Sequence, residues 1–339
     1  MFLPVLLTVI SHSGTLDATL TVQLGGAPAE MLPVLAPGRL FGSFFEDFLH
    51  AADGGAYAEK LANRALALPL ADGADGPGAE GWHAGAGGGV WRDASAPLND
   101  AVRNALWLSP PTLGAAGGGG ASAYNTGFLG AIAVQAGEEL SLSLWVYVRG
   151  GGLISLNATL LAVGADTGAA AVVASAVLLT DESAQPQWRR INATMVAGAG
   201  GCSQCRLQLH ASGAAGAAPA AAAAAPSVGV TVVSLFPAAT FRDRPNGLRR
   251  DVAGWLNESR PAVLRGPGGC YVEGRNISNG WFWKQTLGPI ETRPGHNNDV
   301  RACACRLSPA ASPPTPARPG LLRGTRHSPT HRSHRTTAQ

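Results

Sequence analysis

Between residues 82 and 242, short segments of alternating apolar and polar residues follow one another, and this pattern constrains the fold most strongly. In the clearest segment, residues 139–148, every second residue is apolar: Leu140, Leu142, Leu144, Val146 and Val148. Further segments of this kind lie at residues 153–163, 171–179, 187–196, 206–209 and 228–235. A period of two is typical of a strand with one buried face. Because Gly-rich turns separate the segments, they predict an antiparallel β-sandwich.

Outside this region the pattern changes to strands paired with helices. Residues 40–45 predict a buried strand, and residues 54–66 predict the helix that follows it. Residues 245–257 predict another helix, and residues 263–264 begin a second buried strand. Nearer the N-terminus, residues 15–24 alternate and predict a half-buried strand. Units of strand and helix place their chemistry where the strand ends.

The second buried strand leads into a glycine-rich turn, and Leu264 to Gly274 reads Leu-Arg-Gly-Pro-Gly-Gly-Cys-Tyr-Val-Glu-Gly. The paired glycines lack a Cβ atom, so the backbone can turn tightly and approach a ligand, while the proline fixes its own φ. The turn offers three side chains to a pocket: Arg265, Tyr271 and Glu273. An ordinary tight turn with a structural salt bridge is the alternative interpretation.

Two blocks of sequence, one on each side of the predicted sandwich, point to a family. The first is residues 40–59, followed by Asn63 and Arg64. The second comprises residues 265–274, 283–290 and 293–300. In this order, the blocks resemble the plant-type α-L-arabinofuranosidases of glycoside hydrolase family 51. The resemblance ends after Val300.

The resemblance implies a fold that combines α/β and β parts. It is the N-terminal portion of a (β/α)8 TIM barrel, interrupted by a carbohydrate-binding-like (galactose-binding-like) jelly-roll β-sandwich. The C-terminal tail lies outside the resemblance and lacks apolar periodicity, which predicts that it is disordered. The expected parts are a signal peptide, a first sandwich strand with the first βα unit, the jelly-roll insert, the second part of the barrel fragment, and the tail. Their bounds are residues 1–14, 15–81, 82–242, 243–300 and 301–339.

The same resemblance implies sugar-binding roles for three residues. Glu46 matches the non-catalytic glutamate that hydrogen-bonds the arabinofuranosyl ring in the −1 subsite, and Arg265 is the cation that faces the ligand. Cys270 stands where bacterial members carry a sugar-binding asparagine and plant members carry cysteine. Gly266 departs from the aromatic residue usual at its position, which puts the rigidity of the loop in doubt. A helix-capping or solvated pair is the other interpretation of Glu46 and Asp47.

We assign no catalytic residue to this chain. Retaining glycosidases need two carboxyl groups about 5 Å apart. In the family the acid/base lies in a later Gly-Asn-Glu segment, which does not occur in this sequence, and the nucleophile lies further on. Glu46 and Glu273 are the only acids at two strand ends, and the resemblance assigns neither to chemistry. The family hydrolyses terminal non-reducing α-L-arabinofuranosyl residues of cell-wall arabinoxylan, arabinan or arabinogalactan with retention, and we expect this chain to be inactive.

Non-catalytic carbohydrate binding by the sandwich is the second candidate function. A flat apolar ring can cover the C–H side of a sugar. Four residues could line such a platform: Trp91, Tyr124, Asn125 and Phe128. Core packing is the interpretation that we favour for them.

Several features predict a secreted glycoprotein. Residues 2–10 are apolar and resemble the central part of a secretory signal, although a buried first strand is the alternative. The sequence contains four Asn-X-Ser/Thr acceptor sites: Asn157, Asn192, Asn257 and Asn276. Cys202 and Cys205 form an isolated C-x-x-C, for which a local disulfide is favoured over two free thiols, and a zinc site is not expected.

The distribution of charge limits the classes of binding partner that the sequence predicts. The net charge is +3, but residues 301–339 hold seven arginines and no acid, which leaves 18 basic and 22 acidic residues elsewhere. The part of the chain before residue 301 therefore predicts no nucleic-acid-binding surface. The sequence has no run of eighteen apolar residues, so no membrane span is predicted. We expect an arabinose-containing polysaccharide as partner, no cofactor and no metal; the oligomeric state stays open. The tail is interpreted as sequence from outside the original reading frame or from an intron, with a functional polyanion-binding tail as the alternative.

Overall fold

The computed structural model describes residues 41–47, 50–68, 70, 81–111, 120–152, 154–163, 171–213, 225–274 and 277–296. These residues all belong to one unit, Met1–Cys305. Three predictions fall outside them: the signal peptide, the strand at residues 15–24 and the basic tail. So does the acceptor site at Asn276.

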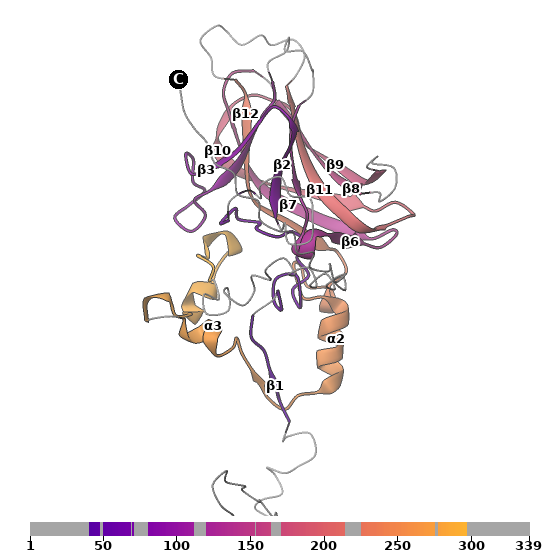
Figure 1. Ribbon diagram of the computed structural model, residues 1–339, viewed down its shortest axis with the longest axis vertical. Coiled ribbons are helices and arrows are strands. Elements are labelled where there is room, and N and C mark those ends of the chain that lie inside the picture. The colour runs from indigo at the N-terminus through magenta and orange to yellow at the C-terminus, as the bar shows by residue number, and fades with distance from the viewer. Residues whose placement is uncertain are drawn as a thin grey trace, which may run out of the picture. The chain divides into compact units, whose positions relative to one another are not determined.

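Two antiparallel sheets account for the described strands between Trp82 and Pro237 (Figure 1). One sheet has five strands in the order β10-β7-β12-β4-β3. The other has six, in the order β2-β5-β11-β8-β9, with β6 pairing with β11. The bounds are β2 Trp82–Gly87, β3 Gly89–Asp93, β4 Ala105–Ser109, β5 Ala121–Asn125, β6 Ile132–Val134, β7 Glu139–Arg149, β8 Ile154–Ala162, β9 Ala171–Glu182, β10 Gln185–Val196, β11 Cys202–Gly213 and β12 Ser227–Pro237. The antiparallel arrangement predicted from the alternation is therefore confirmed.

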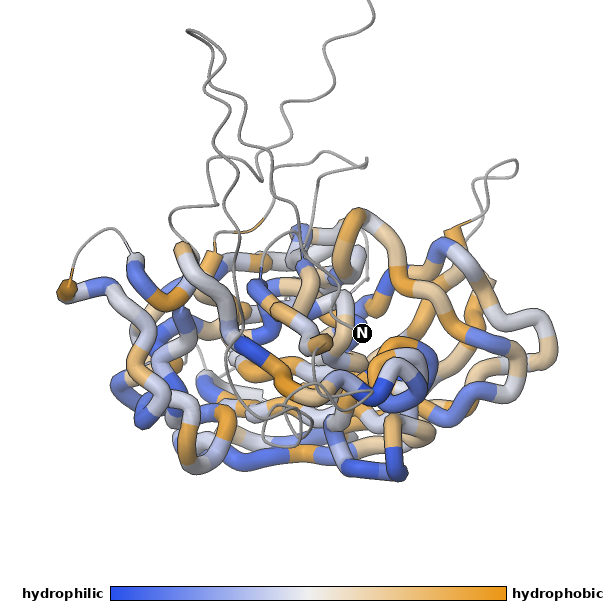
Figure 2. The backbone as a smooth tube through the Cα atoms, turned by 90° about the horizontal axis from the view of Figure 1, so that it is seen from below, coloured by the Kyte–Doolittle hydropathy of each residue, from blue (hydrophilic) through white to orange (hydrophobic). Residues whose placement is uncertain are grey.

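The core lies between the two sheets. Along β7, Leu140, Leu142, Leu144 and Val146 are 0% exposed, as the period of two predicts. Leucines of β8 and β11 in the other sheet belong to the same apolar cluster. Hydrophobic and hydrophilic stretches alternate along the backbone (Figure 2). Because burying one such side chain contributes about 1.5–3 kcal/mol, this cluster is the main source of stability in the described chain.

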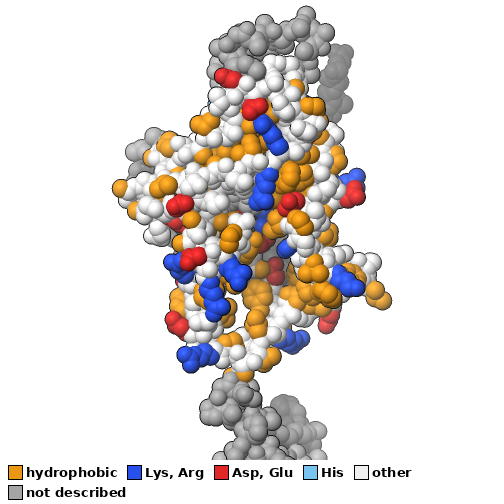
Figure 3. Space-filling model, turned by 180° about the vertical axis from the view of Figure 1, so that it is seen from behind, with side chains coloured by type: hydrophobic (Ala, Val, Ile, Leu, Met, Phe, Trp, Pro, Cys, Tyr) orange, Lys and Arg blue, Asp and Glu red, His pale blue; other side chains and the backbone are white. Residues whose placement is uncertain are grey.

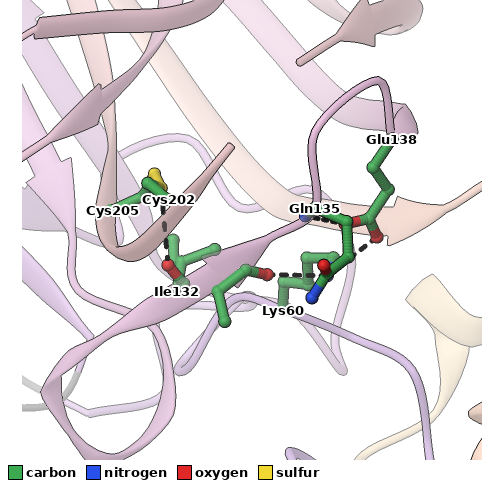
Figure 4. The surroundings of a disulfide bond; sticks show 7 residues. Lys60, Ile132, Gln135, Glu138, Cys202 and Cys205 are labelled. Carbon is green, nitrogen blue, oxygen red and sulfur yellow. Dashed lines mark hydrogen bonds and ion pairs between the residues drawn. A yellow bond between two sulfur atoms is a disulfide. The ribbon is translucent and has the colours of Figure 1, made fainter. Parts of the chain in front are cut away.

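A disulfide joins Cys202 and Cys205 at the start of β11. It lies beside β6, and the Cys202 Sγ is 3.9 Å from the Ile132 carbonyl oxygen (Figure 4). Next to it, the Lys60 Nζ donates to the Ala133 carbonyl oxygen at 2.9 Å and pairs with Glu138 at 3.0 Å. These contacts attach the segment before the sandwich to β6.

The prediction of a helix at residues 54–66 is wrong. The segment forms turns and bends, and several of its backbone groups bond to distant parts of the chain instead of forming helical hydrogen bonds. The Lys60 N–H, for example, donates to the Leu235 carbonyl oxygen of β12 at 2.9 Å. Asn63 and Leu66 have φ values of 52° and 55°, in the left-handed region that a right-handed helix excludes. Tertiary hydrogen bonds have overridden the local helical propensity.

Two short parallel strands lie outside the sandwich: β1 Ser43–Phe44 and β13 Leu264–Arg265. Helix α2, Arg250–Ser259, begins later than predicted because the Arg249 N–H donates to the Ala56 carbonyl oxygen and Arg249 has ψ of 132°. It ends where Arg260 adopts φ of 44°. The remaining elements are α3 Cys270–Glu273 and the 3₁₀ turns η1 Phe128–Gly130, η2 Phe241–Asp243, η3 Ile277–Asn279, η4 Trp283–Thr286 and η5 Ile290–Thr292.

The burial predicted for these flanking strands is also wrong. Phe44 is 53% exposed, and Val263 and Leu264 are 61% and 65% exposed. On α2, Trp255 is 66% exposed and Ala253 is the one buried residue. Hydrophobic side chains accordingly gather at the surface between charged ones (Figure 3). Parallel strands are normally covered on both faces, and no described element covers these faces of β1 and β13.

Candidate functional site

The ends of β1 and β13 bring the two predicted ligand-binding segments together. Phe44 pairs with Arg265 in the parallel register. The Phe45 N–H donates to the Arg265 carbonyl oxygen at 2.8 Å. Because both strands run in the same direction, the residues that follow them, Glu46 and the glycine-rich turn, emerge at the same edge.

Glu46 is held by that turn. Its side chain is buried, with 7% of the residue exposed, and its Oε1 accepts a hydrogen bond from the Tyr271 backbone N–H at 3.0 Å. Gly268 makes room for it: the glycine has φ of 129°, and a Cβ there would lie 2.4 Å from the Glu46 Cγ. Only glycine fits this position without moving Glu46.

The turn is held by its own hydrogen bonds and by a third segment, which contains His296. The Val272 and Glu273 N–H groups both donate to the Gly269 carbonyl oxygen at 3.0 Å, which forms the single turn of α3. The His296 Nε2 lies 2.8 Å from the Tyr271 carbonyl oxygen, and the two rings meet edge to face with centroids 4.6 Å apart. Residues far apart in the sequence therefore enclose the Tyr271 backbone.

Burial and two carboxylates act on the Tyr271 hydroxyl. Burial, followed by the charges of Asp47 and Asp53, raises the pKa of Tyr271 to about 12. Burial also raises the pKa of Asp47, although this carboxylate accepts a hydrogen bond from the Ala52 N–H at 3.0 Å. The phenol thus stays protonated at neutral pH and can donate a hydrogen bond.

Arg265 lies at the end of β13 and Cys270 in the turn that follows it, at the edge where Glu46 also emerges. The Arg265 guanidinium is exposed and lies over the Phe44 ring, 4.8 Å from its centroid. Among the described residues, no hydrogen bond or ion pair joins Arg265 to Glu46. Cys270 is a partly exposed free thiol, and Glu273 points to solvent. The structure brings the strand ends together without joining these side chains.

A second buried carboxylate, Glu59, was not predicted from the sequence. Glu59 is 3% exposed, and its Oε1 accepts hydrogen bonds from the Leu61 and Leu235 N–H groups at 3.1 and 2.8 Å. The Arg64 Nη1 lies 3.5 Å from its other oxygen. Burial raises the pKa of Glu59 to about 7. No pattern in the sequence distinguishes it from a solvated glutamate, since its partner on β12 is distant in sequence.

The four residues considered as a sugar platform do not share a surface. Trp91 lies in the five-stranded sheet, and Tyr124 lies in the other sheet, stacked on His83 with centroids 4.9 Å apart. Asn125 is fully buried, and its Nδ2 donates to the Ala62 carbonyl oxygen at 2.8 Å. Phe128 packs on the His50 ring, with centroids 5.2 Å apart. Core packing therefore holds for Asn125, whereas Trp91, Tyr124 and Phe128 are partly exposed.

Two cavities of about 540 and 530 Å³ open among the described residues, and neither is lined by Glu46, Arg265 or Cys270. Across the same residues, no group of three or more His, Cys, Asp or Glu side chains could hold a metal ion. Nor does that part of the chain include a helix both long and apolar enough to cross a membrane.

Comparisons with known proteins extend these observations. Residues 255–304 match the family described as "Alpha-L-arabinofuranosidase 1 domain". The chain is 32% identical to an extracellular exo-alpha-L-arabinofuranosidase of Streptomyces chartreusis over 76% of its own length and 28% of the relative. It is 31% identical to alpha-L-arabinofuranosidase 1 of Arabidopsis thaliana over 83% of its length and 38% of the relative. The chain thus spans about a third of the relatives that it matches.

A solved structure agrees with the sequence comparison. The arabinose-bound MgGH51 α-L-arabinofuranosidase superposes with a TM-score of 0.61 and 29% identity. The superposition covers 75% of this chain and 38% of that enzyme. Together, these comparisons show that the chain is similar to part of several α-L-arabinofuranosidases, among them the GH51 enzyme of known structure.

Proposed function

We propose that this chain supplies the arabinofuranosyl-binding part of an α-L-arabinofuranosidase. The whole protein would hydrolyse terminal non-reducing α-L-arabinofuranosyl residues of arabinoxylan, arabinan or arabinogalactan with retention. The observation that carries the proposal is the buried Glu46, held by the Tyr271 N–H at the edge where β1 and β13 end. The matches to named arabinofuranosidases, over 76% and 83% of the chain, support it.

The proposed roles follow from the side-chain atoms of Glu46, Arg265 and Cys270 that are available to a sugar. Glu46 Oε1 is occupied by the Tyr271 N–H, so Oε2 would accept a sugar hydroxyl. Arg265 would swing from the Phe44 ring to donate to the sugar, because a planar guanidinium can bind two oxygens at once. Cys270, partly exposed on the same turn, would contact the ring.

In fold terms, we propose that β1, α2 and β13 belong to an incomplete (β/α)8 barrel and that residues 82–242 form a jelly-roll insert. The short parallel pair and its exposed apolar faces support the first assignment. The two antiparallel sheets support the second.

The chain alone is proposed to bind arabinofuranosyl units without cleaving them, since no residue is assigned to catalysis. Purified protein should release no p-nitrophenol from p-nitrophenyl α-L-arabinofuranoside above a Glu46→Ala, Arg265→Ala control. It should, however, give saturation-transfer signals with methyl α-L-arabinofuranoside that this double variant loses. Release above the control would refute the absence of catalysis, and equal signals from both proteins would refute the sugar-binding role.

We further propose that the protein is secreted and N-glycosylated. Asn192 on β10 and Asn257 on α2 are exposed, and Asn157 on β8 is partly exposed, while Asn276 is assigned from its sequence alone. Enzymatic deglycosylation of protein secreted from a plant cell should reduce its mass and convert the modified asparagines to aspartate. An unchanged mass would contradict the assignment.

Polysaccharide binding by the sandwich is a second candidate, favoured by a row of aromatic residues on the outer face of the five-stranded sheet. Trp91, Tyr147 and Trp188 are partly exposed there, around the buried Trp107. Affinity electrophoresis in gels with arabinoxylan tests it. Retardation of a fragment of residues 82–242 would support binding, and unchanged mobility would leave the sandwich a structural role only.

A further inference from the structure

The cavity of about 540 Å³ is built from four separate parts of the chain. The segment before the sandwich contributes Asp53, Tyr57 and Arg64, and the loop before β4 contributes Arg103 and Asn104. Val232 of β12 and the segment that holds Ile290, Arg293 and Pro294 also line it. The volume falls in the range of small-molecule sites, roughly 300–1,000 Å³.

Positive charge dominates this lining, with three arginines against one acid, Asp53. Arg64 is already compensated, because Glu59 lies 3.5 Å away and the charges of Asp53 and Glu59 raise the pKa of Arg64 against the effect of burial. Arg103 is exposed and makes no hydrogen bond or ion pair with a described residue. The Arg293 Nε and Nη2 donate to the Gly288 carbonyl oxygen at 3.1 and 2.7 Å, which fixes the guanidinium and leaves Nη1 free.

We propose that this cavity binds the carboxylate of a hexuronic acid unit through Arg103 and Arg293. A guanidinium matches a carboxylate in geometry, and the charge-assisted hydrogen bonds so formed are stronger than neutral ones. Arg293 is held in place before binding, so less rotational freedom is lost when it pairs.

The rest of the lining favours a sugar acid over a bare anion. Val102, Ile290 and Pro294 offer apolar surface, and the Tyr57 ring can cover the C–H face of a pyranose. The Asn104 amide and the Asp53 carboxylate can bond hydroxyl groups. A small inorganic anion would use the arginines and leave these groups without a partner.

The cavity neighbours the Glu46 site without depending on it. Asp53 lines the cavity and also acts on Tyr271, whose N–H holds Glu46. A polysaccharide with both arabinofuranosyl and uronic acid units could therefore contact both places. The binding of a uronic acid can be measured whether or not the chain binds arabinofuranosyl units.

Isothermal titration of the full chain with D-glucuronate, D-glucose and acetate tests the proposal. D-glucuronate should bind at least tenfold more tightly than D-glucose, and acetate at equal concentration should not displace it. Arg103→Gln and Arg293→Gln should each weaken binding about tenfold, the loss expected for one hydrogen bond to a charged group. Arg244→Gln, an exposed arginine outside the cavity, should bind as the unchanged chain does.

A variant that keeps both arginines distinguishes binding in the cavity from binding elsewhere on the surface. Ala67 lines the cavity and is exposed, so Ala67→Trp fills the space without disturbing the core. This variant should keep its circular dichroism spectrum and lose D-glucuronate binding. Equal affinity for D-glucose and D-glucuronate, displacement by acetate, or unchanged binding by Arg103→Gln or Ala67→Trp would each overturn the proposal.

Discussion

The Glu46 carboxylate accepts a hydrogen bond from the Tyr271 backbone N–H at 3.0 Å, across 225 residues of sequence. The whole sandwich lies between the two residues in the chain. Their contact exists because β1 and β13 pair in parallel, with Phe44 opposite Arg265. The candidate sugar site is therefore a property of strand pairing, and it can be disturbed without changing any polar side chain.

Gly268→Ala should displace Glu46. The new Cβ would lie 2.4 Å from the Glu46 Cγ at a φ of 129°, so both the side chain and the backbone must move. We expect a loss of roughly 1–3 kcal/mol in unfolding free energy and a loss of methyl α-L-arabinofuranoside binding. Urea denaturation and saturation-transfer NMR measure the two effects.

Gly269→Ala is the matched control for that variant. A Cβ at Gly269 would meet nothing within 4 Å. Its stability should stay within about 0.5 kcal/mol of the unchanged chain. Similar behaviour of the two alanine variants would show that Gly268 does not hold Glu46.

Glu59 should make stability fall as the pH rises. Its pKa is raised from 4.5 to about 7 in the folded chain, so between these values the folded state binds a proton that the unfolded state lacks. The stabilisation is fully present below pH 4.5 and lost above about pH 7, a change of roughly 3 kcal/mol.

Urea unfolding at pH 5 and pH 8 measures this contribution against Glu59→Gln, which cannot titrate. The unchanged chain should lose more stability between the two pH values than this variant does. Glu258→Gln, on the exposed face of α2, should behave as the unchanged chain. If Glu59→Gln shows the same pH dependence as the unchanged chain, Glu59 does not titrate in this range.

Gly229→Ala should destabilise the sandwich. A Cβ there would lie 2.8 Å from two carbons of the Trp107 ring. The ring is fully buried and cannot yield easily, because the Arg149 guanidinium stacks 3.5 Å from its centroid. We expect a loss of about 1–3 kcal/mol, measured by urea denaturation with tryptophan fluorescence. Gly213→Ala, with nothing within 4 Å, should be neutral, and an equal loss there would discount the Trp107 clash.

Reduction of the disulfide between Cys202 and Cys205 should lower the thermal stability. The loop that it closes is short, with a sequence separation of 3, so the expected loss is about 2 kcal/mol. Thermal unfolding with and without dithiothreitol measures it, and Cys202→Ser should match the reduced protein. Cys270→Ser, which removes a free thiol, should leave the reductant effect intact. An unfolding temperature unaffected by reductant would count against a stabilising disulfide.

Local patterns predicted six strands of the sandwich, β7 to β12, but did not predict β2 to β6 individually. The alternation in residues 139–148 reports one buried face directly, and β7 has that face fully buried. Strand ends were less accurate: residues 206–209 were predicted, and β11 runs from Cys202 to Gly213. Polar residues at strand ends carry no apolar period, so the pattern stops before the hydrogen bonds do.

The amino-acid sequence by itself determined that residues 139–235 form alternating strands, β7 to β12, and its two matching blocks indicated the resemblance to the α-L-arabinofuranosidases. Only the tertiary structure decided that residues 54–66 bond to β12 instead of forming a helix, and that Glu46 is held by Tyr271. Apolar periodicity is a property of neighbouring residues, so it can be recognised from the local sequence alone. The hydrogen-bond partner of a buried carboxylate depends on which strands lie side by side. This pairing cannot be predicted from the residues near the carboxylate in the sequence.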